Sequence, residues 1–446
     1  MINAPSSKLI TISSTGKTAS KKKRICVALP GIHYTHHSPY VLSTLPMVPY
    51  LEEEYDVTVV YRKILNPEGL DHNYLTIVDE THCSPRERLN TNSYFSPADH
   101  LRLWKYKKVL ARFAEKHAND FDLILEKEWP LLGLFSSVFK PYNVPNVLLA
   151  EAVYKFSKQP PLPAEGSVLN QWVERGAKVG FEQACFYLRK QWSRQANGIV
   201  AETDQLKSFF LDYEYTTPEQ PVYPIPYGVN VERFYPQSRE ACRQQLGIPL
   251  DQFVFTYVGS LNRFIQEPAP LIEALGREQL PNAVFHIVGD GGKRHELEAI
   301  ARQFNAPVVF HGRVAQREVP LHIGAANICV APYNKSLYLN EKFTCASLKI
   351  PEYLACGRPV LTIPCERMDH LLDGQTYGFL VENRVEHYQA FLQNLPNAEM
   401  RSEMEAQLVH DLGNSTLKSK NIVLTWRDIA DMHKQVIEER LAPSRV

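Results

Sequence analysis

The feature that most constrains the fold is an alternation of short apolar segments with helical segments. An apolar run at 24–30 precedes a helical run at 38–54 that prolines interrupt, and a second apolar run follows at 55–62. This spacing predicts strand–helix–strand units, in which right-handed crossovers join parallel strands. The pattern restarts after the segment 223–236, so we expect an α/β protein with two halves.

The expected strands are short and apolar. They are 24–30, 55–62, 121–128, 144–151 and 198–203 in the first half, and 252–261, 282–290, 306–312, 326–333 and 358–364 in the second. The expected helices are 38–54, 98–117, about 165–196, 269–278, 293–304, 318–325 and 425–441.

The length of 446 residues favours two or three domains, since domains usually hold about 100–200 residues. We expect a disordered tail at 1–22, α/β domains at 23–230 and 231–424, and an amphipathic C-terminal helix at 425–446. A proline-rich segment near 228–240 suits a linker. The apolar stripe of the last helix does not say which surface it covers.

Composition excludes several classes of protein. Lysine plus arginine equals aspartate plus glutamate at 49 each, which argues against nucleic acid as a partner. Eight cysteines without a CxxC pair indicate reduced thiols and no zinc site. The polar N-terminus has no signal segment, so we expect a cytoplasmic protein. The basic residues at 21–24 and the region 165–196 are compatible with a peripheral membrane contact, although a solvated strand start and core packing are favoured.

The stretch "SLKIPEYLACGRPVL" (347–361) carries the clearest chemical pattern. Pro351 has no N–H, so the helix is expected to start near Ser347 or Leu348. A helix N-terminus attracts anions, and Lys349 adds a charge that the helix dipole disfavours unless an anion binds there. Glu352, one turn along, suits the paired hydroxyls of a ribose. A surface helix with an incidental lysine and glutamate explains the same spacing equally well.

Three further segments offer weaker signals. In "GSLNRF" (259–264), Gly259 permits close backbone approach and Arg263 offers a donor fork for phosphate. "VGDGGKRHE" (288–296) fits a turn and helix cap, since its spacing matches no phosphate-binding glycine motif. "GIHYTHH" (31–37) places three histidines after the first strand, and His33 is our candidate base or orienting group.

Two more patterns favour structural roles. "DFD" (120–122) precedes a strand instead of following one, so we assign it no metal. The aromatic region 90–115, with Tyr94, Phe95, Trp104 and Tyr106, suits a core more than an acceptor groove.

Seven segments occur in an order that resembles the retaining nucleotide-sugar glycosyltransferases of the GT-B fold, specifically glycosyltransferase family 4. The segments are "VPNVLLAE", "YPIPYGVNVERFYP", "YVGSLNRF", "FHIVGDGG", "VVFHGRV", "VPLHIGAANICVAPY" and "SLKIPEYLACGRPVL". The resemblance covers about 195–385 well and 24–150 loosely. It implies two facing Rossmann-like, doubly wound parallel-sheet domains, with the acceptor on the first and the donor mainly on the second.

The resemblance also implies roles for individual residues. Lys349 and the amides of Ser347 and Leu348 match the pyrophosphate-binding helix tip, and Glu352 matches the ribose-binding glutamate. The nucleobase would meet the backbone of Arg313 and Val314. Gly31 matches a glycine near the donor phosphates, and Gly259 and Arg263 lie in the corresponding loop of the second domain. The catalytic candidates are then His33, Arg263 and Lys349.

The implied activity is a metal-independent hexosyl transfer that retains configuration. The donor would be a UDP- or GDP-linked sugar, with no further cofactor, and the acceptor a glycan, lipid-linked sugar, small molecule or protein. The chain departs from the family at Thr344, Ser260 and Glu151, where many members carry glutamate, arginine and histidine. Two alternatives therefore stay open: a non-catalytic partner subunit that binds a nucleotide sugar, and a nucleotide-sugar epimerase.

Overall fold

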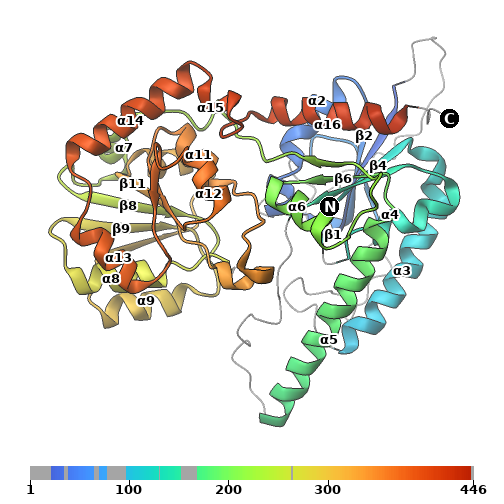
Figure 1. Cartoon of the computed structure of the whole chain (residues 1–446), viewed down its shortest axis with the longest axis horizontal. Helices are drawn as coiled ribbons and strands as arrows, with labels where there is room; N and C mark the ends of the chain where they lie inside the picture. Colours follow the sequence, from blue (N-terminus) through green and yellow to red (C-terminus); the bar gives the residue numbers. More distant parts are fainter. Residues whose placement is uncertain are drawn as a thin grey trace, which may run out of the picture.

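Two α/β domains, each built on one β-sheet, make up the chain (Figure 1). The computed structural model describes residues 22–34, 39–64, 70–77, 97–129, 131–151, 168–262 and 265–442. Both sheets are parallel and are covered by helices on two faces, which confirms the prediction of two Rossmann-like, doubly wound domains. The predicted tail lies outside the described residues, apart from Lys22.

The N-terminal sheet has, in the described part of the chain, seven parallel strands in the order β3-β2-β1-β4-β5-β6-β7. They are β1 (Arg24–Tyr34), β2 (Asp56–Ile64), β3 (Tyr74–Thr76), β4 (Leu123–Lys127), β5 (Asn146–Ala150), β6 (Gly198–Ala201) and β7 (Val222–Pro224). The accompanying helices are α1 (Pro39–Leu42), α2 (Val48–Glu52), α3 (Pro97–His117), α4 (Leu134–Phe139), α5 (Val168–Ser193) and α6 (Asp204–Asp212).

Side chains of the N-terminal sheet alternate between two cores, as the pleat requires. Val27 of β1 packs in the cluster that contains residues of α2, whereas Ala28 packs with residues of α3 and α4. Because both faces are covered, the strands read as nearly continuous apolar runs, which explains why the sequence identified them.

The C-terminal sheet has six parallel strands within the described residues, in the order β10-β9-β8-β11-β12-β13. They are β8 (Phe253–Val258), β9 (Ala283–Val288), β10 (Val308–Gly312), β11 (Ile328–Ala331), β12 (Val360–Thr362) and β13 (Gly378–Leu380). The helices are α7 (Arg239–Leu246), α8 (Ala269–Glu278), α9 (Arg294–Gln303), α10 (Val319–Gly324), α11 (Lys349–Ala355), α12 (Glu366–Leu371), α13 (Val385–Gln393), α14 (Ala398–Gly413), α15 (Thr416–Ser419) and α16 (Trp426–Leu441).

Helix α16 returns to the N-terminal domain, which the sequence did not indicate. Its buried residues Trp426, Ile429 and Ile437 belong to the same core cluster as Val27. A capping box starts the helix: Thr425 accepts from the N–H of Asp428, and the Asp428 carboxylate accepts from the N–H of Thr425. Figure 1 shows this red helix crossing from the C-terminal domain to lie over the N-terminal one.

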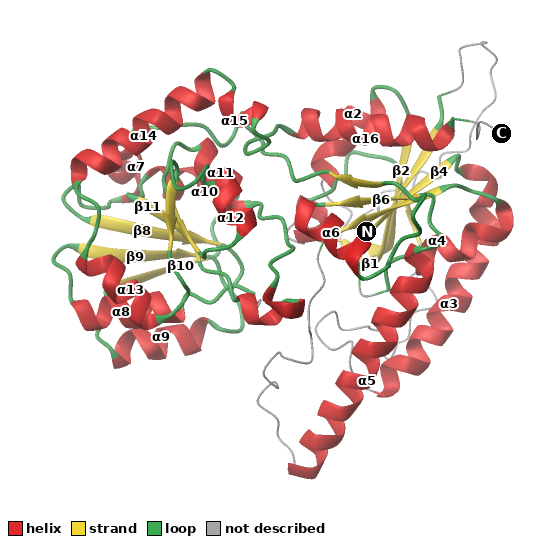
Figure 2. Cartoon of the chain, viewed as in Figure 1, coloured by secondary structure: helices red, strands yellow, loops and turns green. Residues whose placement is uncertain are grey.

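One local difference from the expected elements has a simple cause. The single helix expected at 38–54 is divided into α1, a 3-10 turn at Leu45–Met47 and α2, because Pro46 and Pro49 lie in the first turns of the second and third pieces. Helix α5 has 26 residues, somewhat fewer than the expected region of about 165–196, and extends away from the domain (Figure 2). Among the described residues, no helix combines the length and apolarity that crossing a membrane requires.

Candidate functional site

The loops that follow β8, β9 and β10 are joined at the carboxyl edge of the C-terminal sheet. Gly259 N–H donates to Val288 O over 2.9 Å, and Gly289 N–H donates to Gly312 O over 2.8 Å. Gly289 has φ +141°, and a Cβ atom there would overlap Gly259 O. Glycine is therefore required for this close approach, which makes a flat backbone surface at the sheet edge where parallel α/β sheets bind ligands.

Helix α11 starts beside these loops, and its ends follow the predicted pattern. It begins at Lys349, and Pro351 lies in its first turn. Ser347 Oγ accepts hydrogen bonds from Ile350 N–H, at 3.2 Å, and from the Tyr333 hydroxyl, at 2.6 Å. Gly357, with φ +70°, ends the helix by donating to Leu354 O.

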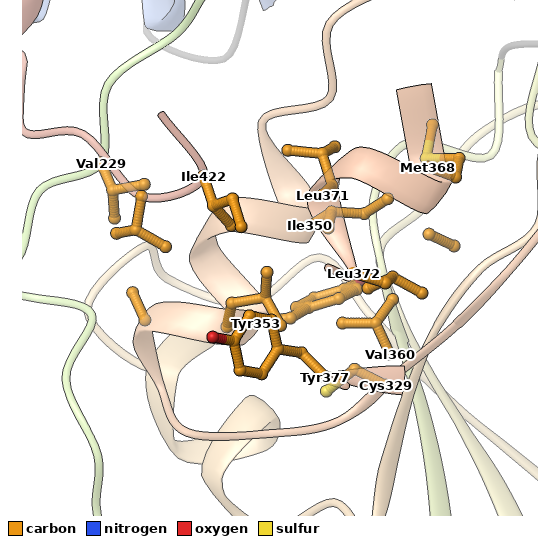
Figure 3. Close-up of a cluster of buried hydrophobic side chains, with 14 of the residues drawn as sticks. Val229, Cys329, Ile350, Tyr353, Val360, Met368, Leu371, Leu372, Tyr377 and Ile422 are labelled. Atoms are coloured by element: carbon orange, nitrogen blue, oxygen red, sulfur yellow. The ribbon is translucent and has the colours of Figure 1, made fainter. Parts of the chain in front are cut away.

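The apolar face of α11 is fixed in the domain core. Figure 3 shows Ile350 and Tyr353 among Val360, Leu372 and Tyr377, and all five side chains are fully buried. The Tyr353 hydroxyl also accepts from the N–H of Val258, 2.9 Å away, at the end of β8. The helix start thus has a fixed position relative to the strand-end loops.

Lys349 extends from this helix start across the β8 loop. A Cβ atom built at Gly259 would lie 3.4 Å from Lys349 Cε. The ammonium group lies 5.3 Å from the ring centroid of Tyr333 and 5.7 Å from that of Tyr257. Both aromatic rings attract a cation, which offsets part of the unfavourable interaction with the helix dipole.

Glu352 is partly buried one turn further along α11. Burial raises its pKa to about 7, against the opposing charges of Lys349 and Arg233. Arg233 also donates to Gln316 Oε1 over 2.7 Å, which links the inter-domain segment to the loop after β10. Arg233 was missed as a site residue, because no spacing rule relates it to a glutamate so far along the chain.

Two further residues of the C-terminal domain that were predicted to bind the nucleotide-sugar donor follow β10. Arg313 is exposed and Val314 partly buried, directly after β10 and next to Gly312. Arg263 falls outside the described residues, so its predicted role has no structural counterpart.

The structure describes the predicted site residues of the N-terminal domain less completely than those of the C-terminal domain. Gly31 lies near the end of β1, where a Cβ atom would come within 2.8 Å of Trp129 Cε3, so packing alone requires glycine. The backbone of His33 belongs to β1, but its side chain is outside the description. The Tyr106 hydroxyl donates to Pro30 O from a buried position, so this aromatic residue belongs to the core. Tyr94, Phe95 and the side chain of Trp104 are not described.

The start of α11 also touches the N-terminal domain. Leu348 packs against the core cluster that holds α2 and α16. Close by in the chain, Thr344 O accepts a 2.9 Å hydrogen bond from Thr203 Oγ1, at the start of α6. The candidate donor site therefore lies at the junction of the two domains.

Two of the three residues that depart from the family pattern, Glu151 and Ser260, have defined side-chain partners. Glu151 accepts from Lys127 Nζ, at 2.9 Å, and from Ser43 Oγ, at 3.2 Å. Ser260 Oγ accepts from Asn262 N–H over 3.2 Å. Both side chains therefore have structural roles in the unliganded protein.

Both aspartates of the "DFD" segment have side-chain partners within the N-terminal domain. Asp122 binds Arg24 at 2.8 Å, which lowers the pKa of Asp122, and Asp120 lies 2.7 Å from His117. In the described ranges, no group of three or more histidine, cysteine, aspartate or glutamate side chains is arranged to hold a metal ion.

The arrangement of two parallel-sheet domains places this protein in the GT-B class of folds. A sucrose-phosphate synthase from Thermosynechococcus elongatus aligns with a TM-score of 0.66 at 17% identity, covering 94% of this chain and 99% of that one. Anabaena HepE, solved in complex with UDP and glucose, aligns with a TM-score of 0.65 at 14% identity, covering 94% and 100%. These likenesses establish the fold.

A family model described as glycosyl transferases group 1 matches residues 252–397. The matched part contains the β8, β9 and β10 loops and α11, so the candidate site lies within the region that resembles group 1 glycosyltransferases.

Curated relatives match over part of their length. The D-inositol 3-phosphate glycosyltransferase of Geodermatophilus obscurus is 27% identical over 203 residues, or 43% of each chain. The putative teichuronic acid biosynthesis glycosyltransferase TuaC of Bacillus subtilis is 34% identical over 112 residues, 24% of this chain and 26% of its own. The matches with these two relatives span less than half of either protein.

Proposed function

We propose that this protein is a retaining, metal-independent glycosyltransferase that moves a hexosyl group from a nucleoside-diphosphate sugar to an acceptor hydroxyl. The observation that carries the proposal is the convergence of Lys349, Glu352 and the Gly259 loop within the segment that matches group 1 glycosyltransferases. Neither the epimerase nor the partner-subunit alternative has an observation in its favour.

Each group has a distinct role in the proposed donor complex. Lys349 and the amides of Ser347 and Leu348 hold the diphosphate, and Glu352 accepts hydrogen bonds from the ribose hydroxyls. The nucleobase lies along the backbone at Arg313 and Val314. Since α11 is only seven residues long, we assign most of the attraction for the diphosphate to the Lys349 charge.

In the proposed reaction, the bond between the anomeric carbon and the β-phosphate oxygen breaks as the acceptor oxygen attacks the same face. The acceptor proton passes to the departing phosphate oxygen, so no separate nucleophile is needed. The protein stabilises the negative charge that grows on the leaving diphosphate. Fixed backbone amides and Lys349 supply this stabilisation without reorganising.

Thermal-shift measurements with UDP, GDP and their sugars test the donor site. HepE has been solved with UDP and glucose, so we test UDP and UDP-glucose first. A ligand at 100 times its dissociation constant stabilises the native state by about 2.7 kcal/mol. We expect Lys349→Ala and Glu352→Ala to abolish the shift, with little change in the unliganded melting temperature.

Lys342→Ala is the matched control, because Lys342 is exposed and makes only a 4.0 Å contact with Asp212. A full shift in both site variants would show that the nucleotide site is elsewhere. Release of nucleoside diphosphate in the presence of an acceptor panel then tests the transfer step.

A further inference from the structure

A buried arginine whose Nε has no hydrogen-bond acceptor among the described residues lies at the domain junction. The Arg367 side chain on α12 is 6% exposed, yet its Nε finds no acceptor among the described residues. Burial lowers the pKa of this guanidinium. A desolvated charge that lacks partners is costly, so its retention calls for an explanation.

Other buried arginines of the same domain show what a purely structural arginine looks like here. Arg243, 3% exposed, donates four hydrogen bonds, three of them to backbone carbonyls. Arg358, 5% exposed, donates to the carbonyls of Gly324, Gly357 and Gln237. Among the described residues, the fold thus supplies acceptors to these two arginines but none to Nε of Arg367.

A complementary group lies on the N-terminal side of the junction. Glu202, at the end of β6, is 4% exposed; its Oε1 accepts from Lys127 at 3.4 Å, while its Oε2 has no partner in the described part of the chain. Burial, followed by the charge of Glu151, raises the pKa of Glu202 well above its usual range. A neutral carboxyl group can both donate and accept a hydrogen bond.

Arg367 and Glu202 lie in the same neighbourhood. The charges that act most strongly on Arg367 are those of Asp204 and Glu202, on either side of Thr203. Thr203 itself donates to Thr344 O, and the buried hydroxyl of Thr344 also has no partner among the described residues. Buried polar atoms without partners among the described residues therefore occur on both sides of this contact between the domains.

We propose that Glu202 and Arg367 form a subsite that binds the hydroxyl groups of an uncharged sugar or cyclic polyol acceptor. This assignment rests on the proposed function, because it places the acceptor beside the segment that leads to Ser347 and Lys349. Because both side chains are almost fully buried, binding at this subsite requires the two domains to separate.

The charges around the subsite favour a neutral ligand. The charged groups that act most strongly on Arg367, Asp204 and Glu202, are acidic and would oppose an anionic ligand, so the arginine is not an excess cation that awaits a phosphate. A cationic ligand would instead meet Arg367 together with the buried Lys127. A hydroxyl group can accept from the guanidinium and exchange hydrogen bonds with the carboxyl group, which satisfies both.

Saturation-transfer NMR on the full chain tests this subsite. The probes are glucose, mannose, N-acetylglucosamine and myo-inositol, with glucose 6-phosphate and glucuronate as anionic counterparts. Each is measured with and without saturating UDP or GDP. We expect at least one neutral probe to bind, and Arg367→Met and Glu202→Gln each to weaken it at least tenfold.

Two controls separate binding from folding. Glu366→Gln removes an exposed carboxylate next to Arg367 and should leave sugar binding unchanged. Arg367→Met should not lower the melting temperature, since no native hydrogen bond of Nε is lost. Failure of every neutral probe, a preference for the anionic probes, or unchanged affinity in Arg367→Met would each overturn the proposal.

The change in melting temperature that a nucleotide causes distinguishes a failure of this subsite from a failure of the proposed function. If the shift persists in Arg367→Met but sugar binding is lost, both proposals are supported. If the nucleotide shift is present and Arg367→Met leaves sugar binding intact, only the subsite is wrong. If no nucleotide binds while a neutral sugar still depends on Arg367, the subsite stands and the transferase assignment falls.

Discussion

The side chain of Lys349 lies against the backbone of Gly259, with only 3.4 Å between Lys349 Cε and the position that a Cβ atom at residue 259 would take. This contact joins the start of α11 to the loop after β8. It brings together a glycine and a lysine that are distant in sequence, as the proposed donor site requires.

Gly259→Ala should therefore damage the site. The added methyl group would lie 2.6 Å from the Tyr257 hydroxyl, so Tyr257 and Lys349 must move. We expect a loss of about 1–3 kcal/mol in stability, measured by urea unfolding, and at least tenfold weaker nucleotide binding. Gly292→Ala is the control, because its nearest neighbour would be 3.7 Å away. Equal nucleotide affinity in both variants would contradict this account.

Glu352 should make stability depend on pH. Its pKa rises from an ordinary 4.5 to about 7 on folding, so the native state binds the extra proton between these values. The stabilisation is complete below pH 4.5 and is lost as the pH rises through 7. Glu352→Gln should therefore match the parent near pH 4.5 and exceed its unfolding free energy by up to about 3 kcal/mol at pH 8. A difference that does not vary with pH would rule this out.

Three neighbouring histidines should lower the free energy of unfolding at acidic pH, whereas Glu352 lowers it at alkaline pH. His311 Nε2 and His286 Nδ1 are 2.9 Å apart, and the His322 ring centroid lies 4.6 Å from that of His311. Burial lowers the pKa of His286 and of His322 from 6.5 to about 4, with further contributions from neighbouring imidazoles and, for His286, Arg243. Because the unfolded chain binds these protons first, stability should fall as the pH drops from 6.5 towards 4.

The loss amounts to up to about 3 kcal/mol for each of His286 and His322, measured by urea unfolding at a series of pH values. His322→Gln should flatten this dependence, whereas the exposed His295→Gln should leave it unchanged. Identical slopes in all three proteins would show that the cluster is not responsible.

Thr203→Val should loosen the domain junction. Thr203 Oγ1 accepts from Leu206 N–H as the cap of α6 and donates to Thr344 O. We expect a loss of about 1–2 kcal/mol and an increased radius of gyration in X-ray scattering. Ser238→Ala removes a comparable cap within the C-terminal domain, at α7, and should lower stability without changing the radius. An unchanged radius in Thr203→Val would show that this bond does not hold the domains together.

The sequence predicted the sheets well because strands buried on both faces appear as apolar runs. It missed β3, β7 and β13, each three residues long, since so few residues carry no periodic pattern. It did not place α16, because an apolar stripe specifies burial but not the partner surface. Only the packing of Trp426 and Ile437 identifies the N-terminal sheet as that partner.

The residues of the candidate site also fall into two groups, those that the sequence identified and those that it missed. Lys349, Glu352 and Gly259 were identified because they lie in short segments whose residue types indicate their chemistry. Arg233 and Arg367 were not, because their significance depends on contacts between residues far apart in the chain. An arginine that lacks acceptors can be recognised only once its surroundings are known.

The central claim is that the start of α11 binds the diphosphate of an activated sugar. A crystal structure of the full chain with the nucleoside diphosphate that gives the largest thermal shift tests it most directly. We predict phosphate oxygens within hydrogen-bond distance of Lys349 Nζ and the Leu348 amide, with the ribose hydroxyls on Glu352. A nucleotide bound elsewhere, with no contact to Lys349 or Glu352, would contradict the account.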